Sequence, residues 1–438
     1  MPQFTMISQF ILGLSIIVGL HELGHMLLAK LFGMRVESYT IGFPPKIIQC
    51  KWGETVYSLG AIPLGGFVKI AGMAEEALDT AHPGDKPCPW EFRAKPAWQR
   101  LLVILGGILF NVLSGILIFT AITFSLGDTY LAKDEVNKHG IVPHALGASL
   151  GFQEGDQITH INGRDFTKFA DVMDPRVLLE DGGYYTVRRQ GQVLHIAIPT
   201  NFLAQLADHP GQGSFIAPLA PFEVGEVQQS SPAAQAGLQP GDQIMEVADQ
   251  ATPYFHQLRT ALAAHAGTPV SIKYVRDGIE YHITARVDET GKLGFRPKIL
   301  LTEVHQQHSV LQATAIGTTR ALEIVRINSL ALRKVITGQV SFAKSLSGPI
   351  GIAQIFGRRF DWIHFWSVVG FLSMMLAFTN LLPIPALDGG HIVLISYEMI
   401  AGRRLPGRLL EVVQMIGITM LLLLTSYAIF NDLCKLFQ

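Results

Sequence analysis

Cysteine is scarce in this 438-residue chain: Cys50, Cys88 and Cys434 lie far apart and form no C-x-x-C pair. The sequence therefore indicates neither a thiolate zinc site nor a disulfide framework. Charged side chains are also scarce, at 16% of all residues, and 34 basic residues are balanced by 35 acidic ones. Because no strong basic field would attract it, we expect no nucleic acid partner.

Apolar residues are abundant instead, at 49% of the chain, and the mean hydropathy is +0.31. This composition indicates a membrane protein with a soluble insert. Four apolar runs, at residues 4–32, 101–126, 363–382 and 409–430, are near or above the ~20 residues that a bilayer-spanning helix needs. The first run has neither a basic start nor a cleavage site, so we expect it to be retained.

The first apolar run contains His21-Glu22-Leu23-Gly24-His25, an H-E-x-x-H sequence. On a helix, both histidines project from one face and can bind one metal ion, which we expect to be zinc. Glu22 lies about 100° round the helix from His21, where it can reach a metal-bound water as a general base. A chance match is the alternative, although three ionisable side chains in an apolar helix are costly without a function.

Basic residues follow the first apolar run and precede the second, among them Lys30, Arg35, Arg93, Lys95 and Arg100. Such residues favour the cytoplasm. We therefore expect the loop between these runs to be cytoplasmic and residues 127–307 to lie outside. His21 is then about 25 Å along its helix from Phe4, so the metal lies within the membrane, nearer the cytoplasmic face.

The cytoplasmic loop contains β-favouring residues on both sides of a Gly/Pro-rich stretch, within residues 52–70. This pattern predicts a strand, a turn near residues 60–66 and a second strand. So apolar a hairpin can dip toward the membrane, and its free edge can pair with an extended substrate. An ordinary surface hairpin is the alternative.

The soluble insert contains an internal repeat. The segment G-F-Q-E-G-D-Q-I at residues 151–158 recurs as G-L-Q-P-G-D-Q-I at residues 237–244, 86 residues later. Both copies resemble a segment of bacterial, circularly permuted PDZ domains, and this resemblance implies a partly open sheet that binds an extended peptide. The alternative is that the copies have lost the peptide groove and act only as bulk outside the membrane.

We therefore expect a polytopic α-helical membrane protein with four transmembrane helices, a membrane-associated β-hairpin and two inserted α+β PDZ-like domains. Residues 1–128 hold the first two transmembrane helices and the hairpin loop. Residues 129–220 and 221–307 are the PDZ-like domains. Residues 308–360 form surface helices, and residues 361–438 hold the last two transmembrane helices.

The third apolar run ends in N-L-L-P-I-P-A-L-D-G-G-H, at residues 380–391. Two prolines interrupt a helix near membrane depth, which is tolerated where the backbone lines a cavity. A catalytic zinc usually takes three protein ligands, so Asp388 is the best candidate for the third. The alternatives are that Asp388 caps the next helix or that His391 is the ligand. Asn380 is expected to hydrogen-bond the substrate carbonyl, unless it only joins two helices.

Together these motifs resemble the site-2 protease family of intramembrane zinc metalloproteases over nearly the whole chain. HELGH matches its H-E-x-x-H, residues 380–389 match its N-x-x-P-x-P-x-L-D-G, and residues 64–69 resemble its membrane-reentrant β-element. The resemblance implies zinc ligands, a general base and a group of substrate contacts: His21, His25 and Asp388 for Zn²⁺, Glu22 as base, and Asn380, Gly65, Gly66 and Phe67 for the substrate. Gly106-Gly107 stands where the family usually has Gly-Pro, which leaves the role of Asn111 open.

The resemblance also implies substrates and a location. The substrates would be single-pass membrane proteins already trimmed by another protease, including an anti-sigma factor and remnant signal peptides. The location would be the bacterial inner membrane, with the active site toward the cytoplasm and the PDZ-like domains in the periplasm. Two other functions are a membrane-held PDZ scaffold with a vestigial metal site and a zinc transporter, which a single compact site and four spans disfavour.

Overall fold

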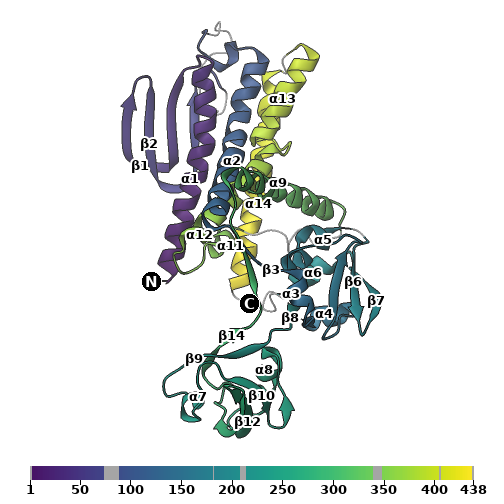
Figure 1. The fold of residues 1–438 in the computed structure, drawn as a ribbon. Coiled ribbons are helices and arrows are strands. Elements are labelled where there is room, and N and C mark those ends of the chain that lie inside the picture. The colour runs from purple at the N-terminus through teal and green to yellow at the C-terminus, as the bar shows by residue number, and fades with distance from the viewer. Residues whose placement is uncertain are drawn as a thin grey trace. The chain divides into compact units, whose positions relative to one another are not determined.

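The computed structural model describes residues 2–73, 88–180, 182–207, 214–338, 348–403 and 406–436. The chain divides into two compact units (Figure 1). One, called here the helical unit, comprises Met1–Gly127 with Gln307–Gln438, and the other, called the insert, is Asp128–Gln306. Each unit is described by itself.

The helical unit contains the following helices among its described residues: α1 (Pro2–Leu31), η1 (Phe92–Ala94), α2 (Ala97–Leu126), α9 (Val310–Ile336), α11 (Pro349–Ile355), α12 (Trp362–Leu381), α13 (Asp388–Ala401) and α14 (Gly407–Leu436). Four segments of the described part are long and apolar enough to cross a membrane: Gln3–Leu31, Ala97–Leu126, Trp362–Leu381 and Val412–Cys434. These match the four predicted spans, whose ends differ by at most four residues.

Proline determines where α12 ends. Leu382 has an extended conformation, with φ −66° and ψ 141°, as expected for a residue directly before Pro383. Neither Pro383 nor Pro385 has an amide hydrogen with which to continue the helix. The helix α13 begins at Asp388, and its N-cap is Leu387. Asp388 is therefore the first residue of α13 and not its N-cap.

Glycine allows α1 and α2 to lie very close together (Figure 1). A Cβ atom added to Gly24 of α1 would lie 2.2 Å from the carbonyl oxygen of Gly106 in α2. On Gly107, an added Cβ would lie 2.4 Å from His25 Nε2 and 2.5 Å from His21 Cε1. All three distances are far inside van der Waals contact. Gly106 thus allows the close approach of the two helices, and Gly107 leaves room for the two histidine rings.

Apolar side chains hold the remaining helices to this pair. Met26 of α1, Val103 of α2 and Ile395 of α13 belong to one buried cluster. Residues of α1, α12 and the segment around Phe356 form a second cluster. These contacts bring α13, and Asp388 at its start, toward the H-E-x-x-H helix.

The loop after α1 forms two long strands, β1 (Val36–Trp52) and β2 (Thr55–Ile70). The turn predicted near residues 60–66 is confirmed by the strand pairing, although β2 runs through it, and the chain also reverses at residues 53–54. Residues 56–59 pair with 38–41 in the same direction, whereas residues 66–70 pair with 36–41 in the opposite direction, so the chain turns back between residues 60 and 66. Tyr39 pairs with both Tyr57 and Val68, so residues 36–41 lie between the two predicted strands, where a simple hairpin would have paired those strands directly.

Four segments of this sheet lie side by side, in the order 46–52, 55–60, 36–41 and 66–70. Among the described residues, the segment 66–70 is paired along one side only, by residues 36–41. Its other side is a free strand edge. Such an edge presents unpaired amide and carbonyl groups to an extended chain.

The predicted surface helices at residues 308–360 include α9 and α11, whereas residues 339–347 lie outside the described residues. Helix α9 buries Ala313, Gly317 and Ala321. Its Arg320 donates a hydrogen bond from Nη1 to Thr123 Oγ1 of α2, at 2.9 Å. This helix therefore packs against the second span through small side chains.

The insert mixes short helices and strands and has two separate hydrophobic cores. The first core is built from β3 (Asp128–Leu131), α3 (Lys133–Asn137), β4 (Ile141–Pro143), α4 (Ala145–Leu150), β5 (Gln157–Ile161), η2 (Phe169–Met173), α5 (Pro175–Leu179), β6 (Tyr184–Arg189), β7 (Gln192–Ala197), α6 (Phe202–Ala207) and β8 (Ile216–Pro218). Its described sheets have the orders β5-β6-β7 and β4-β8.

The second core is built from β9 (Phe222–Val227), α7 (Pro232–Gln235), β10 (Gln243–Val247), β11 (Gln250–Ala251), α8 (Phe255–Ala264), β12 (Pro269–Arg276), β13 (Ile279–Arg286) and β14 (Phe295–Ile299). Its described sheets have the orders β11-β10-β12-β13 and β14-β9. The last strand, β15 (Glu303–Gln306), pairs with β3, so the insert begins and ends in one antiparallel pair.

The sequence repeat is also a structural repeat. Asp156 accepts the amide of Gln153 and pairs with Arg189 at 2.7 Å. In the second copy, Asp242 accepts the amide of Gln239 and pairs with Arg276 at 2.6 Å. Both aspartates are fully buried. The hydrogen bonds to Asp156 and Asp242 raise the pKa of the two arginines above their ordinary values.

Candidate metal centre

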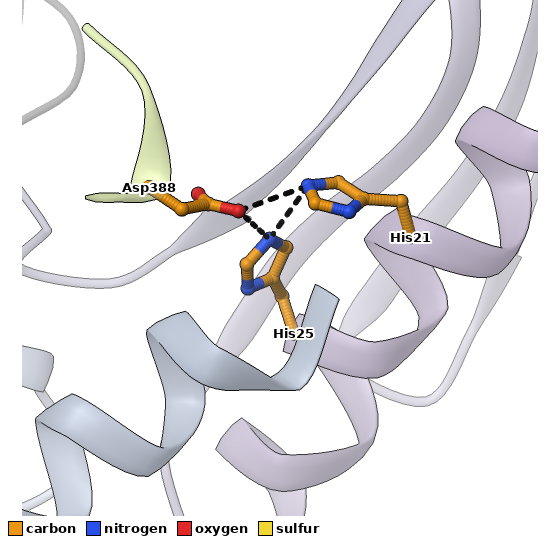
Figure 2. Close-up of side chains that lie close together, drawn as sticks. All are labelled: His21, His25 and Asp388. Carbon is orange, nitrogen blue, oxygen red and sulfur yellow. Dashed lines mark hydrogen bonds and ion pairs between the residues drawn. The ribbon is translucent and has the colours of Figure 1, made fainter. Parts of the chain in front are cut away.

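Three side chains meet where α1 approaches the start of α13. His21 and His25 lie one turn apart on α1, and their Nε2 atoms are 3.2 Å apart. Asp388 Oδ2 lies 3.1 Å from His21 Nε2 and 3.6 Å from His25 Nε2. Figure 2 shows the two rings and the carboxylate directed at one another. The ligand atoms of these residues all lie within 4.8 Å of one another.

The donor set fits a zinc ion. Ligand atoms about 2.1 Å from a tetrahedral zinc are roughly 3.4 Å apart, and the three separations in this site are 3.2, 3.1 and 3.6 Å. Asp388 Oδ2 is buried without a well-formed hydrogen bond to any described residue, which is costly for a carboxylate that has no metal. Two imidazoles and one carboxylate also leave a fourth position for water.

Neighbouring groups orient both rings. His25 Nδ1 lies 2.9 Å from the Val103 carbonyl oxygen of α2. A carbonyl only accepts hydrogen bonds, so this contact keeps the proton on Nδ1 and leaves the Nε2 lone pair facing the site. His21 Nδ1 lies 3.2 Å from the side-chain amide of Asn111, which is fully buried. The sequence left the role of Asn111 open, and the structure places it beside the first histidine of the H-E-x-x-H motif.

Glu22 lines a cavity of about 320 Å³ beside the three candidate ligands. It is not part of the ligand cluster. Its charge acts on Tyr39 of β1, because burial and then the Glu22 carboxylate raise the pKa of that phenol to about 12. The Tyr39 hydroxyl donates to the Gly19 carbonyl oxygen at 2.7 Å, and this bond attaches the sheet to the helix that carries Glu22.

The free edge of β2 forms one wall of the cavity. Gly66, Phe67, Val68 and Ile70 line it, together with Met73, Ala386, His391, Gln414 and Ile418. Gly65 does not line the cavity, and a Cβ added to it would lie 2.6 Å from the Phe43 ring. The sheet edge therefore faces the candidate metal site through Gly66 and the residues that follow it.

Asn380 lies at the end of α12 and is 7% exposed. Its Nδ2 atom lies 3.2 Å from His21 Nε2, so the predicted substrate contact does belong to the site. His391 lines the same cavity but is not among the clustered ligand atoms. The geometry thus favours Asp388 over His391 as third ligand.

A buried ion pair holds α13 in position behind the site. Arg100 Nη2 of α2 lies 2.6 Å from Glu398 Oε1 of α13, and Arg100 is 7% exposed. Arg100 had been considered only for its charge at a span end. The carbonyl of Val103 and the side chain of Gln414 were also missed. Gln414 had a sequence signal, since an amide within an apolar span is uncommon.

The model of peptidase family M50 matches residues 9–424. A protein from Neisseria meningitidis that is named as a zinc metalloprotease is 29% identical over 98% of both chains. The regulator of sigma E protease from Haemophilus influenzae is 28% identical and covers 98% of this chain and 99% of its own length. Its counterpart from Salmonella typhimurium is 28% identical over 98% of both chains. The predicted relationship to site-2 proteases is confirmed: the chain belongs to peptidase family M50 and is a zinc metalloendopeptidase.

Proposed function

We propose that this protein hydrolyses a peptide bond within or near the membrane segment of single-pass membrane proteins. The observation that carries the proposal is the convergence of His21, His25 and Asp388 on one point, between helices apolar enough to span a membrane. We assign these three residues to Zn²⁺ and Glu22 to the general base. When bound, zinc supplies Lewis-acid activation of a water molecule and of the scissile carbonyl.

Glu22 moves the proton in this scheme. It takes a proton from the attacking water while the water oxygen bonds to the carbonyl carbon. As the carbon–nitrogen bond breaks, Glu22 passes the proton to the leaving amine. Asn380, with its amide 3.2 Å from His21 Nε2, donates a hydrogen bond to the carbonyl oxygen as it becomes negative.

The sheet edge at residues 66–70 holds the substrate in an extended form. A helical peptide bond is already hydrogen-bonded and shielded, so the substrate must unwind before it is cleaved. An unwound segment can then pair with the free edge of β2, which lines the cavity beside Glu22. Gly66 and Phe67 contact it directly, and Gly65 supports the same edge.

Asn111 keeps His21 in the form that binds metal. Binding through His21 Nε2 requires a proton on Nδ1, which then needs an acceptor. The oxygen of the Asn111 amide is buried and has no hydrogen-bond partner among the described residues. The alternative orientation of this amide exchanges its oxygen and nitrogen, which places the oxygen 3.2 Å from His21 Nδ1, where it accepts the proton of the ring.

The insert acts as two PDZ-like domains, residues 129–220 and 221–307. The membrane-associated parts are residues 1–128 before it and residues 308–360 and 361–438 after it. The shared Asp–Arg pair and the two separate cores support this division. We place these domains in the periplasm of a bacterial inner-membrane protein, where they exclude large substrates or bind peptides. The active site faces the cytoplasm, and an anti-sigma factor and remnant signal peptides are the substrates. Two relatives are named regulator of sigma E protease, which agrees with the first of these substrates.

The test is to map the cleaved bond. The full-length protein in liposomes is mixed with a single-pass substrate that has a short outer domain, in water enriched in ¹⁸O. Mass spectrometry should find one cut within the membrane segment and one ¹⁸O atom in the new carboxylate. Peptide binding without any cut would favour the scaffold, and zinc flux into the liposomes would favour the transporter.

A further inference from the structure

Gln414 is a polar side chain in the fourth candidate span that the proposed chemistry does not use. It lines the cavity that contains His21, Glu22 and Asp388. Among the described residues it has no hydrogen-bond partner. An amide on a membrane helix is costly unless it faces water, protein or a ligand. The cavity is therefore the place where its hydrogen-bonding groups can be satisfied.

The packing of α14 directs Gln414 into this cavity. A Cβ atom added to Gly417 would lie 2.1 Å from the Pro385 carbonyl oxygen, so α14 touches the proline-rich segment just before Asp388. Gln414 lies three residues before Gly417 and four before Ile418, which also lines the cavity. Residues with this spacing share one helix face.

The rest of α14 offers no packing role for an amide in this region. The neighbouring Met415 and Ile416 are 67% and 61% exposed, and Leu422 and Leu423 are 62% and 67% exposed. These apolar side chains suit a lipid-facing surface. Gln414 therefore stands out as the polar residue of a face that is otherwise in contact with the Pro385 segment.

We propose that Gln414 binds the main chain of the extended substrate, from a different wall of the cavity than the β2 edge. A side-chain amide offers one acceptor and two donor hydrogens, which complement the N–H and C=O of a peptide unit. A helical segment has already used these groups internally, so Gln414 selects substrates that unwind, whatever their side chains. This inference rests on the proposed function, because it requires a peptide beside the metal site.

The test measures peptide binding without turnover. The full-length Glu22→Gln protein in detergent micelles is titrated with a fluorescent peptide that carries a membrane segment with a central Asn-Pro. Adding Gln414→Met removes the amide at nearly constant volume and should weaken binding about tenfold, since two ordinary hydrogen bonds are lost. Gln414→Asn, which keeps the amide on a shorter side chain, should bind with intermediate affinity.

The matched control is Thr419→Val on the same helix. Thr419 is exposed and its hydroxyl donates to the Met415 carbonyl oxygen of its own helix, so its loss should leave peptide affinity unchanged. Zinc content should be the same in all variants. In the active protein, which retains Glu22, Gln414→Met should raise KM for the substrate about tenfold and change kcat much less.

Substitutions in the peptide backbone test whether Gln414 binds a main-chain N–H of the peptide. Replacing single amides of the unwound segment by esters removes one N–H at a time. At one position, the ester should weaken binding to the protein that retains Gln414 but not to its Gln414→Met variant. Equal peptide affinity of these two proteins, while wild type still cleaves substrate, would overturn this inference alone. A wild type that neither cleaves nor binds the peptide would overturn the proposed function with it.

Discussion

Replacing Gly107 by alanine should deprive the site of zinc while leaving the helices folded. The new methyl group would lie 2.4 Å from His25 Nε2 and 2.5 Å from His21 Cε1, about 1 Å inside ordinary contact. The two helices cannot move apart without losing the close contact between Gly24 and Gly106. The rings must therefore turn away, although a zinc site tolerates only about 0.2 Å of error in its ligand distances.

The expected loss of zinc affinity is at least about 100-fold, which corresponds to roughly 2.7 kcal/mol. Affinity is measured by competition with a chromophoric chelator on the purified protein in detergent, and metal content by mass spectrometry. Gly115→Ala on the same helix is the control, because its Cβ would meet the Met374 side chain at 2.5 Å, away from the site. The proposed geometry would be refuted if Gly107→Ala kept its zinc affinity while Gly115→Ala lost zinc affinity.

Three further substitutions test the ligands, their support and the insert. Asp388→Ala should lower zinc occupancy while His391→Ala keeps it, and the reverse pattern in metal analysis would make His391 the ligand. Asn111→Leu should weaken zinc binding about 10–100-fold in a chelator competition; equal affinity would show that the amide does not orient the first histidine of the motif. Asp242→Asn removes a fully buried carboxylate from its arginine and should speed amide hydrogen exchange across residues 222–299 but not 141–198, whereas uniform exchange rates would mean that the pair does not stabilise its repeat.

The sequence was most informative where physical requirements act locally. A bilayer demands about 20 apolar residues whatever the fold, so the four spans were predicted to within a few residues. The spacing of His21 and His25 fixes their common face on any helix. The sequence also predicted Asp388 as third ligand, because a zinc ion bound by two histidines needs one, and the structure places its carboxylate beside both rings.

Contacts between segments that are distant in the sequence could not be predicted from it. The strand β2 pairs with two parts of β1, and such a register depends on which faces become buried after folding. The need for Gly107 is visible only when α2 lies against both histidine rings. Gln414 carried a signal in sequence, but only the contact of Gly417 with Pro385 shows which way it faces.

The most direct test of the account compares wild type with Glu22→Gln, both purified at full length, for zinc content and for cleavage of a single-pass substrate with a short outer domain. Glu22 lines the cavity but is not among the three clustered residues that we assign to zinc. We therefore expect equal zinc in both proteins and cleavage by wild type alone. Equal cleavage by Glu22→Gln would contradict the assigned base, and no cleavage by zinc-loaded wild type would contradict the intramembrane protease itself.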